Sequence, residues 1–169
     1  MTTKSPGRVF WPLASLMVLA DCSSKRAIEA SAPGVGVSKP VVEDIVRFTL
    51  EYNTGAAFST NFGPYQRWVL IGATLLFLFI VARSYRQITS TGRVATIGLA
   101  LLAGGAVGNL LDRLLSSRGV VDFIDVGTQS ARFYIFNFAD AGVSIGAALL
   151  AYALWRSGQR EDALETTAP

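Results

Sequence analysis

Residues 104–140 read GGAVGNLLDRLLSSRGVVDFIDVGTQSARFYIFNFAD and lie between two strongly apolar segments. The stretch carries four carboxylates, Asp112, Asp122, Asp125 and Asp140, and apolar residues flank Asp122 and Asp140. A carboxyl group in or near lipid is energetically costly, so in a membrane protein it indicates a functional site. Two such groups held together cannot both ionise easily, and a shared proton is the basis of aspartic-protease chemistry. We therefore interpret this stretch as an intramembrane site for peptide hydrolysis.

The composition indicates a membrane protein of one domain. Only 16% of the 169 residues are charged, whereas soluble domains are usually nearer a quarter. The apolar fraction of 51% and the mean hydropathy of +0.41 agree with this deficit. A chain of this length suits one compact bundle, so residues 1–169 are expected to form a single integral-membrane domain.

The residue types that are missing exclude several kinds of chemistry. The chain has no His, which removes Ser-His and Cys-His nucleophile systems and most zinc sites. A lone cysteine, Cys22, excludes an internal disulfide and a cysteine-rich metal cluster. The net charge of +3 comes from scattered basic residues, so nucleic acid is not expected as a partner. We predict no metal and no other cofactor.

Four apolar segments predict four transmembrane helices, at residues 9–28, 68–83, 94–111 and 133–155. The run 94–111 is uncharged throughout and approaches the roughly 20 residues that span a bilayer. The second run is shorter, but arginines at both its ends can extend toward the membrane surface. Asn137 and Asp140 interrupt the fourth run near its start.

The first segment is open to two interpretations. Its charged start and short apolar core resemble a secretory or lipoprotein signal peptide, with Cys22 as a lipid acceptor. However, Asp21 directly precedes Cys22, whereas the cleavage site needs small uncharged residues. The alternative is a retained membrane helix in which Asp21 and Lys25, spaced i and i+4, pair near its outer end. We favour the retained helix.

Residues 41–66 predict a small sheet between the first and second helices. From Ile45 to Tyr52, apolar and polar residues alternate, which is typical of a half-buried strand. Residues 53–55 (NTG) then supply turn chemistry. The pattern alone is equally compatible with a solvated connector that contains one hairpin.

An even number of spans places both termini on one side of the membrane. Residues 84–93, between the second and third spans, contain Arg86 and Arg93 but no acid. Basic loops tend to remain in the cytoplasm, so both termini and this loop are expected there. The raw count of Lys and Arg does not decide the orientation, because the other connections also hold basic residues.

Each carboxylate also has a simpler, structural interpretation. Asp140 could cap the helix that follows it by accepting hydrogen bonds from backbone N–H groups, and Asn137 could do the same. Asp122 could be a surface acid on a short strand or turn. Asp112 and Arg113 are neighbours and could form a local ion pair at a helix end.

Considered jointly, the carboxylates favour chemistry. Peptide hydrolysis without a metal, His or activated Ser needs one group to deprotonate water and another to protonate the departing amine. Two carboxylates of unequal pKa supply both, and apolar surroundings raise the pKa of one of them. The apolar neighbours of Asp122 and Asp140 favour this pair, whereas Asp125 is expected to be a solvated charge.

Short motifs carry a resemblance to a known family. They are NTGAAF at residues 53–58, GNLLDR at 108–113, GVVDF at 119–123 and FNFAD at 136–140. In order and spacing they resemble the bacterial lipoprotein signal peptidases (signal peptidase II), and Asp21 and Lys25 extend the resemblance over nearly the whole chain. The resemblance implies an intramembrane aspartic endopeptidase that removes signal peptides from diacylglyceryl-modified prolipoproteins and cuts before the lipidated Cys.

The resemblance also implies roles for individual residues. Asp122 and Asp140 would be the catalytic pair. The residues that would bind substrate or support the site are Asp21, Lys25, Asn53, Gly55, Asn109, Asp112, Arg113 and Asn137. Cys22 stands where the family usually has Gln, and it would be a structural or bystander thiol.

The surroundings of the enzyme follow from the same resemblance. It implies a multi-pass protein of the bacterial inner membrane, with the active site near the extracytoplasmic face and both termini in the cytoplasm. The sheet would form a periplasmic cradle. Lipid-modified prolipoproteins and membrane lipids would be the partners, and the protein would act as a monomer.

Two other classes of function are compatible with the residues. A small proton- or ion-coupled membrane transporter could use Asp122 and Asp140 as titrating groups along a polar path. The small number of spans and the lack of a visible internal repeat argue against it. An assembly or anchor protein could use the glycines of the third segment for helix packing without any chemistry.

Overall fold

The apolar segments form long helices in the computed structural model, which describes residues 6–55 and 63–167. The helices are α1 (Gly7–Ser31), α2 (Gln66–Ser90), α3 (Arg93–Leu115) and α4 (Phe138–Thr167), and a short 3₁₀ helix, η2 (Gly63–Tyr65), precedes α2. The strands are β1 (Ser38–Val42), β2 (Val46–Asn53) and β3 (Val120–Val126). The predicted mainly helical fold with a small sheet is therefore confirmed.

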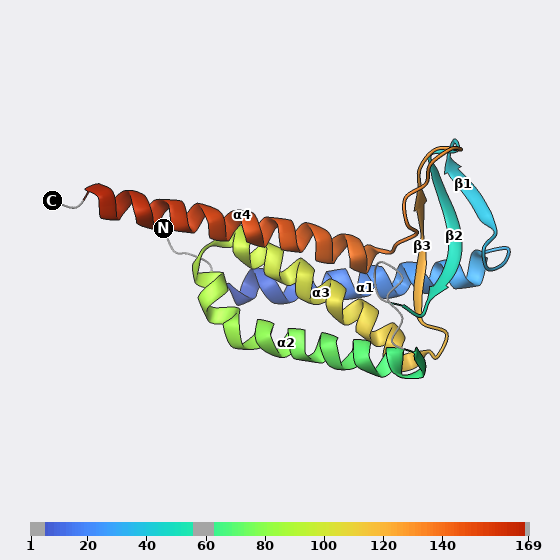
Figure 1. Ribbon diagram of the computed structural model, residues 1–169, viewed down its shortest axis with the longest axis horizontal. Helices are drawn as coiled ribbons and strands as arrows, with labels where there is room; N and C mark the ends of the chain where they lie inside the picture. Colours follow the sequence, from blue (N-terminus) through green and yellow to red (C-terminus); the bar gives the residue numbers. More distant parts are fainter. Residues whose placement is uncertain (1–5, 56–62, 168–169) are drawn as a thin grey trace.

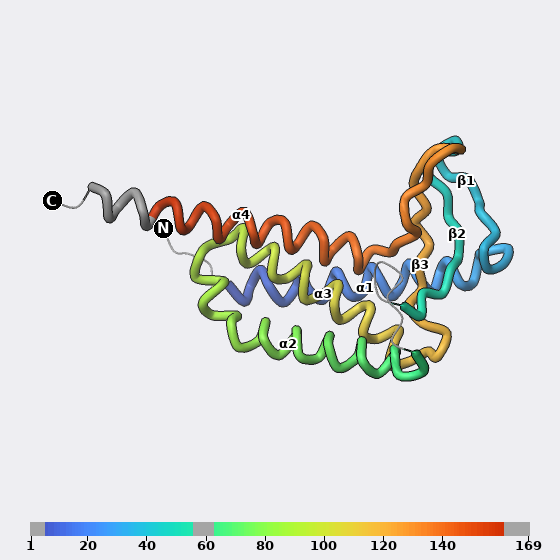
Figure 2. The backbone as a smooth tube through the Cα atoms, in the orientation of Figure 1, coloured from blue at the N-terminus to red at the C-terminus, as the bar shows by residue number. Residues whose placement is uncertain are grey.

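The helices run alternately up and down a bundle, and the sheet stands across one end of it (Figure 1). The start of α1, the α2–α3 connection and the end of α4 lie at the opposite end, as the chain trace in Figure 2 also shows. α3 is the central helix, because it packs against α1, α2 and α4. Most of its buried residues are Ala or Gly, which lets neighbouring backbones approach closely.

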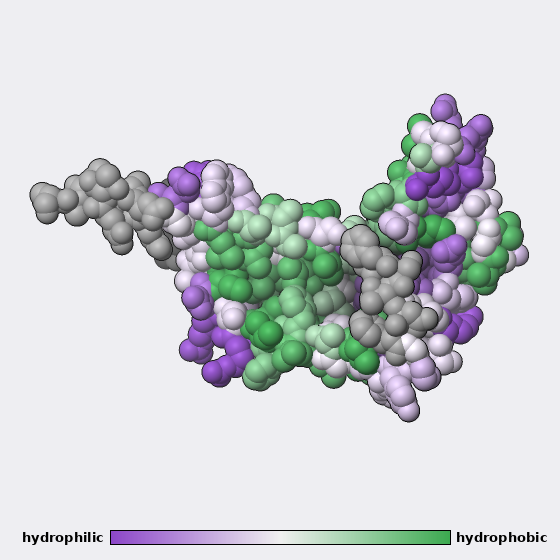
Figure 3. Space-filling model, in the orientation of Figure 1, coloured by the Kyte–Doolittle hydropathy of each residue, from purple (hydrophilic) through white to green (hydrophobic). Residues whose placement is uncertain are grey.

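Three helices are long and apolar enough to cross a membrane: Gly63–Ser90, Arg93–Leu115 and Phe138–Arg160. Among the described residues, α1 falls outside this set, because charged residues toward both its ends, among them Arg8 and Asp21, shorten its apolar run. Figure 3 shows hydrophobic residues over the middle of the bundle and hydrophilic residues toward its ends. This distribution suits a bundle that sits in a bilayer.

The sheet is antiparallel and has the order β1–β2–β3. The sequence placed it within residues 41–66, and this location is wrong for β3, which comes from the connection between α3 and α4. The β2–β3 register shifts between Phe48 and Glu51. Thr49 and Leu50 are both buried as a result, so β2 does not follow the strict alternation that its sequence suggests.

α4 begins at Phe138 rather than at residue 133, where the apolar pattern starts. The preceding segment is extended along β3, because the Phe133 N–H donates to the Val126 carbonyl at 2.8 Å and Phe136 exchanges backbone hydrogen bonds with Ile124. At the other end of the bundle, residues 84–90, which were predicted as a loop, continue α2. The late start of α4 places polar side chains of the FNFAD motif at a helix N-terminus.

The contact between α3 and α4 depends on two facing glycines. A Cβ on Gly146 would lie 2.6 Å from the Gly98 carbonyl oxygen and 2.6 Å from the Leu102 nitrogen. We expect Gly146→Val to lower the free energy of unfolding in detergent by about 1–3 kcal/mol, the usual cost of overpacking. Gly72→Val is the matched control, because a Cβ at Gly72 meets no atom within 4 Å. Equal stability of the two variants in a denaturant titration would contradict this account.

Candidate active site

Asp122 lies in β3, and it is almost fully buried, with 3% exposure. One carboxylate oxygen accepts a hydrogen bond from Asn53 Nδ2 at 3.0 Å, and the other accepts one from Asn137 Nδ2 at 2.6 Å. Asn53 is the last residue of β2, and Asn137 directly precedes α4. The pairing of two strands and the start of a helix therefore fix this carboxylate from two sides.

Asp140 and Asn137 cap the N-terminus of α4 reciprocally. Asn137 Oδ1 accepts the Asp140 N–H at 2.9 Å, and Asp140 Oδ2 accepts the Asn137 N–H at 3.2 Å. This arrangement is a capping box, in which two backbone N–H groups without helical partners are satisfied. Asp140 Oδ1 accepts a further hydrogen bond from Asn109 Nδ2 at 2.8 Å. The capping role expected for Asp140 is present, and it directs one carboxylate oxygen toward α3.

Two asparagines connect the two carboxyl groups. Asn137 Nδ2, which donates to Asp122, also lies 3.2 Å from Asn109 Oδ1, and Asn109 donates to Asp140. The negative charge of Asp140 is close enough to act on Asp122 electrostatically. The structure thus gathers residues from β3, α3 and the start of α4 into one polar cluster.

A buried ammonium group supports this cluster from α1. Lys25 is 2% exposed, and its Nζ lies 2.7 Å from Asp21 Oδ2, 2.8 Å from Asp112 Oδ2 and 2.9 Å from Asn109 Oδ1. The expected pair of Asp21 with Lys25 is therefore present. Asp112 pairs with Lys25 rather than with its sequence neighbour Arg113, so the local ion pair considered for Asp112 is wrong.

Arg113 lies beside the carboxylates, and a second arginine holds the end of its helix. The Arg113 guanidinium donates to the Asn109 carbonyl at 3.2 Å, and it is close enough to interact with Asp140 and Asp122. Arg67, at the start of α2, donates to the carbonyls of Arg113 and Leu114 at 2.6 and 3.1 Å. These carbonyls belong to the last turn of α3 and lack helical partners. The sequence indicates only a membrane-boundary position for Arg67, because its carbonyl partners lie on a distant helix.

Asn53 is held by a tight turn at the end of β2. Its Oδ1 accepts the Gly55 N–H at 2.9 Å, while its Nδ2 donates to Asp122. Gly119 has a φ of 107° and approaches so closely that a Cβ would lie 2.5 Å from the Asn53 carbonyl oxygen, so glycine is required there. The motif that begins at Asn53 continues through residues 56–58, which lie outside the described residues.

Asp125 is not the solvated charge that the sequence suggested. It is 4% exposed, and its carboxylate accepts hydrogen bonds from Thr49 Oγ1 at 3.1 Å and Arg132 Nε at 2.5 Å. Arg132 also donates to the Asp125 carbonyl oxygen at 3.1 Å. Asp125 is therefore part of a buried ion pair that fastens β3 to β2 and to the following loop.

Burial raises the pKa of Asp122 to about 6. The loss of water around the carboxylate is the largest cause, and the charge of Asp140 acts in the same direction. Hydrogen bonds from Asn53 and Asn137 and the charge of Lys25 oppose this rise in the pKa. A carboxyl group with such a pKa can both take up and release a proton near neutral pH. The cluster therefore pairs a readily protonated carboxyl group with a second one.

The family model for signal peptidase (SPase) II matches residues 13–156, a range that includes every candidate site residue. The chain belongs to the signal peptidase II family. A lipoprotein signal peptidase of Pseudomonas fluorescens is 36% identical over 155 residues, which are 89% of this chain and 90% of that protein. Another, from Cellvibrio japonicus, is 40% identical over 148 residues, or 83% of each chain. These findings confirm the resemblance carried by the motifs.

Solved structures of bacterial membrane enzymes share the fold of this signal peptidase II. One has a TM-score of 0.77 at 28% identity and covers 88% of both chains. A second has a TM-score of 0.71 at 29% identity and covers 85% of this chain and 90% of its own. The chain is therefore a membrane peptidase by family, and nothing in these comparisons supports the transporter or the anchor interpretation.

The raised pKa of Asp122 predicts a pH-dependent stability. Because the folded state binds this proton more tightly than the unfolded chain, stability should fall as the pH rises through about 6. Asp122→Asn lacks the titrating group. From pH 4 to pH 8, its free energy of unfolding in detergent should therefore rise relative to the wild type by about 2 kcal/mol.

Glu51→Gln provides the control, because Glu51 is an exposed carboxylate directly opposite Asp122 on β2. Its stability relative to the wild type should change little over the same pH range. If Asp122→Asn and the wild type instead kept a constant difference from pH 4 to pH 8, Asp122 would not titrate as described.

Proposed function

We propose that this signal peptidase II removes signal peptides from lipid-modified prolipoproteins by an aspartic mechanism that uses Asp122 and Asp140. Its relatives are named lipoprotein signal peptidases. The observation that carries the catalytic assignment is the amide bridge, in which Asn137 and Asn109 hold both carboxyl groups in one hydrogen-bonded network. The bond to be cut is the peptide bond before the lipidated Cys of the substrate.

The two carboxyl groups divide the acid and base work between them. The ionised one accepts a proton from a water molecule as the water oxygen attacks the scissile carbonyl carbon. The protonated one gives its proton to the carbonyl oxygen, and a neutral tetrahedral diol forms. When the C–N bond breaks, the dyad returns one proton to the departing amine and accepts one from the diol. These steps need no cofactor, and one chain supplies both groups, so a monomer suffices.

Neighbouring residues keep the pair in this shared-proton state. Asn53 and Asn137 donate hydrogen bonds to Asp122 and stabilise its ionised form, while burial stabilises its protonated form. Asn109 donates to Asp140 in the same way. Arg113 is placed to bind a substrate carbonyl or a lipid phosphate, because its planar guanidinium offers several donors in a fixed geometry.

We place the enzyme in the bacterial inner membrane with four spans, α1 to α4. α1 can join the other three because its charged residues Asp21 and Lys25 are buried against the bundle instead of facing lipid. The sheet and both carboxyl groups belong to one end of the bundle, which becomes the periplasmic side, with the sheet as a cradle. Arg86 and Arg93 flank the α2–α3 connection at the other end, which becomes the cytoplasmic side together with both termini.

Reporter fusions can test this orientation. A reporter that is active only outside the cytoplasm should be active when fused after Glu43, in the β1–β2 turn. It should be inactive when fused after Thr91, in the α2–α3 connection. Activity on the same side for both fusions would contradict four spans with a periplasmic sheet.

The decisive test of the mechanism is the removal of either acid. Asp122→Asn and Asp140→Asn keep the size of the side chain but cannot exchange the required proton. Each should lower kcat for a lipidated prolipoprotein by roughly 10³-fold or more, and the double variant should lose little beyond this, because members of a catalytic unit are not additive. The rates are measured in detergent or vesicles with a lipidated substrate.

Glu51→Gln is again the matched control, and its kcat should stay near that of the wild type. Yield after solubilisation and helical circular dichroism establish that each variant folds. If both folded Asp→Asn variants cleaved the substrate at near wild-type rates, the aspartic mechanism would be refuted. The capping box would then be the whole role of Asp140.

A further inference from the structure

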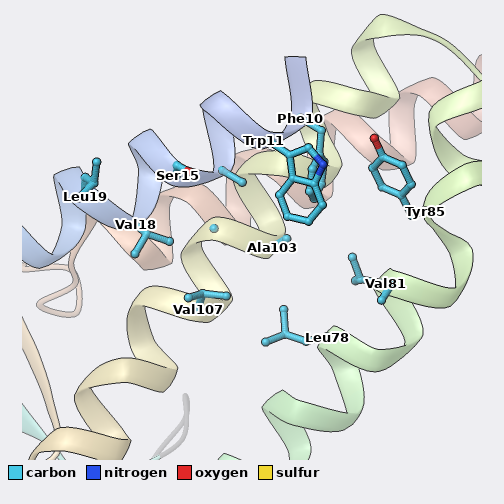
Figure 4. Close-up of a pocket in the computed structure, with 13 residues that line it drawn as sticks. Phe10, Trp11, Ser15, Val18, Leu19, Leu78, Val81, Tyr85, Ala103 and Val107 are labelled. Atoms are coloured by element: carbon cyan, nitrogen blue, oxygen red, sulfur yellow. The ribbon is translucent and has the colours of Figure 1, made fainter. Parts of the chain in front are cut away.

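A large apolar groove lies between α1 and α2, over the middle of α3 (Figure 4). Its volume is about 650 Å³, within the range of about 300–1,000 Å³ that is typical of small-molecule sites. Trp11 and Val18 line it from α1, Leu78 and Val81 from α2, and Val107 from α3. The rings of Phe10 and Tyr85 meet edge to face, with their centroids 4.9 Å apart, but the backbones of α1 and α2 do not approach closely in the described parts of the chain, so the groove opens between them.

The groove is separate from the candidate active site. Val107, in its floor, and Asn109, which bonds to Asp140, are two residues apart on α3 and therefore about 200° apart around the helix axis. Phe10 and Tyr85 also line the groove, near the start of α1 and the end of α2, so it extends toward the end of the bundle away from the sheet. A peptide held at Asp140 would leave this groove unfilled.

Two arginines continue the lining of the groove toward that end. Arg8 stands three residues before Trp11 and seven before Ser15, on one face of α1. Arg86 follows the lining residue Ala82 by four positions on α2, again on one face. Both arginines are exposed. The apolar groove therefore ends beside two guanidinium groups.

The helix segments that line the groove carry no acid to compensate these positive charges. Residues 1–20 and 66–111, which include the groove-lining parts of α1, α2 and α3, contain no Asp or Glu. Among the described side chains, no ion pair engages Arg8 or Arg86. A phospholipid has the matching chemistry, because it joins an apolar chain to an anionic phosphate. We propose that the groove binds one acyl chain of an anionic phospholipid whose phosphate pairs with Arg8 and Arg86.

Trp11 provides the probe for this site. In a Trp68→Phe/Trp155→Phe background it is the only tryptophan of the chain. The full-length protein is reconstituted in vesicles in which part of the lipid carries a brominated acyl chain, which quenches tryptophan fluorescence on contact. Each basic residue near a lipid headgroup strengthens binding of an anionic lipid over a neutral one by about fivefold. The mole fraction of brominated phosphatidylglycerol needed to quench Trp11 should therefore be lower than that of brominated phosphatidylcholine by about fivefold or more.

Amino-acid substitutions test which residues cause the preference for phosphatidylglycerol. Arg8→Gln/Arg86→Gln should remove most of it, so that the two brominated lipids quench nearly alike. Arg156→Gln/Arg160→Gln is the matched control, because it removes the same charge from exposed arginines of α4, which does not line the groove. Val107→Phe, which fills the floor of the groove, should also lower the preference for phosphatidylglycerol.

The proposal rests on the membrane placement of α1, and the experiment separates the two. Equal quenching of the wild type by both lipids would overturn the lipid site and leave the groove to an uncharged chain. A preference that survives in Arg8→Gln/Arg86→Gln, or in Val107→Phe, would place the lipid elsewhere and also overturn it. No quenching by either lipid would refute the membrane placement of α1 itself, whereas the catalytic assignment is tested independently by the Asp→Asn variants.

Discussion

A single buried ammonium group, that of Lys25, determines how α1, α3, β3 and α4 meet. Burying one ion costs several kcal/mol, and the carboxylates of Asp21 and Asp112 offset this cost only while all three stay in place. Each carboxylate also holds a backbone group of another element: Asp21 accepts the Ala139 N–H at 2.8 Å in the first turn of α4, and Asp112 accepts the Val121 N–H at 3.1 Å in β3. The elements that carry Asp140 and Asp122 are therefore both anchored to the same positive charge.

Local patterns in the sequence predicted the parts of this arrangement that lie within one helix. Long apolar runs gave the helices, and the i, i+4 spacing of Asp21 and Lys25 gave their pairing, which is present at 2.7 Å. The same rule explains why the neighbours Asp112 and Arg113 do not pair: consecutive residues point about 100° apart around a helix. Asp112 is thereby turned toward α1, and Lys25 meets it there at 2.8 Å. Residue identity suggested a pair, but helix geometry decides the partner.

Contacts between distant segments could not be predicted from one sequence. β2 and β3 are separated along the chain by all of α2 and α3, so no local pattern shows that Asp122 lies opposite Glu51. Asp125 appears solvated in sequence because its partner Thr49 is on β2, and pairing of the strands buries both. The motifs did name the residues that the fold gathers into the polar cluster, because the resemblance to the family records their types and spacing. They did not give the hydrogen bonds, since these form only when β3 and the start of α4 meet.

The candidate active site and the apolar groove share a structural origin in the packing of α3. Glycines bring its neighbours close: a Cβ on Gly105 would lie 2.4 Å from the Ala139 carbonyl of α4, and one on Gly104 would lie 2.8 Å from the Ala14 carbonyl of α1. This close approach lets Lys25 reach Asn109, which in turn bonds to Asp140. α2 packs on α3 from another side and meets α1 through the rings of Tyr85 and Phe10, without a close approach of the two backbones, so a space stays open between them. The tight contacts of α3 with α1 and α4 thus build the polar site, and the wider separation of the α1 and α2 backbones leaves an apolar groove between them.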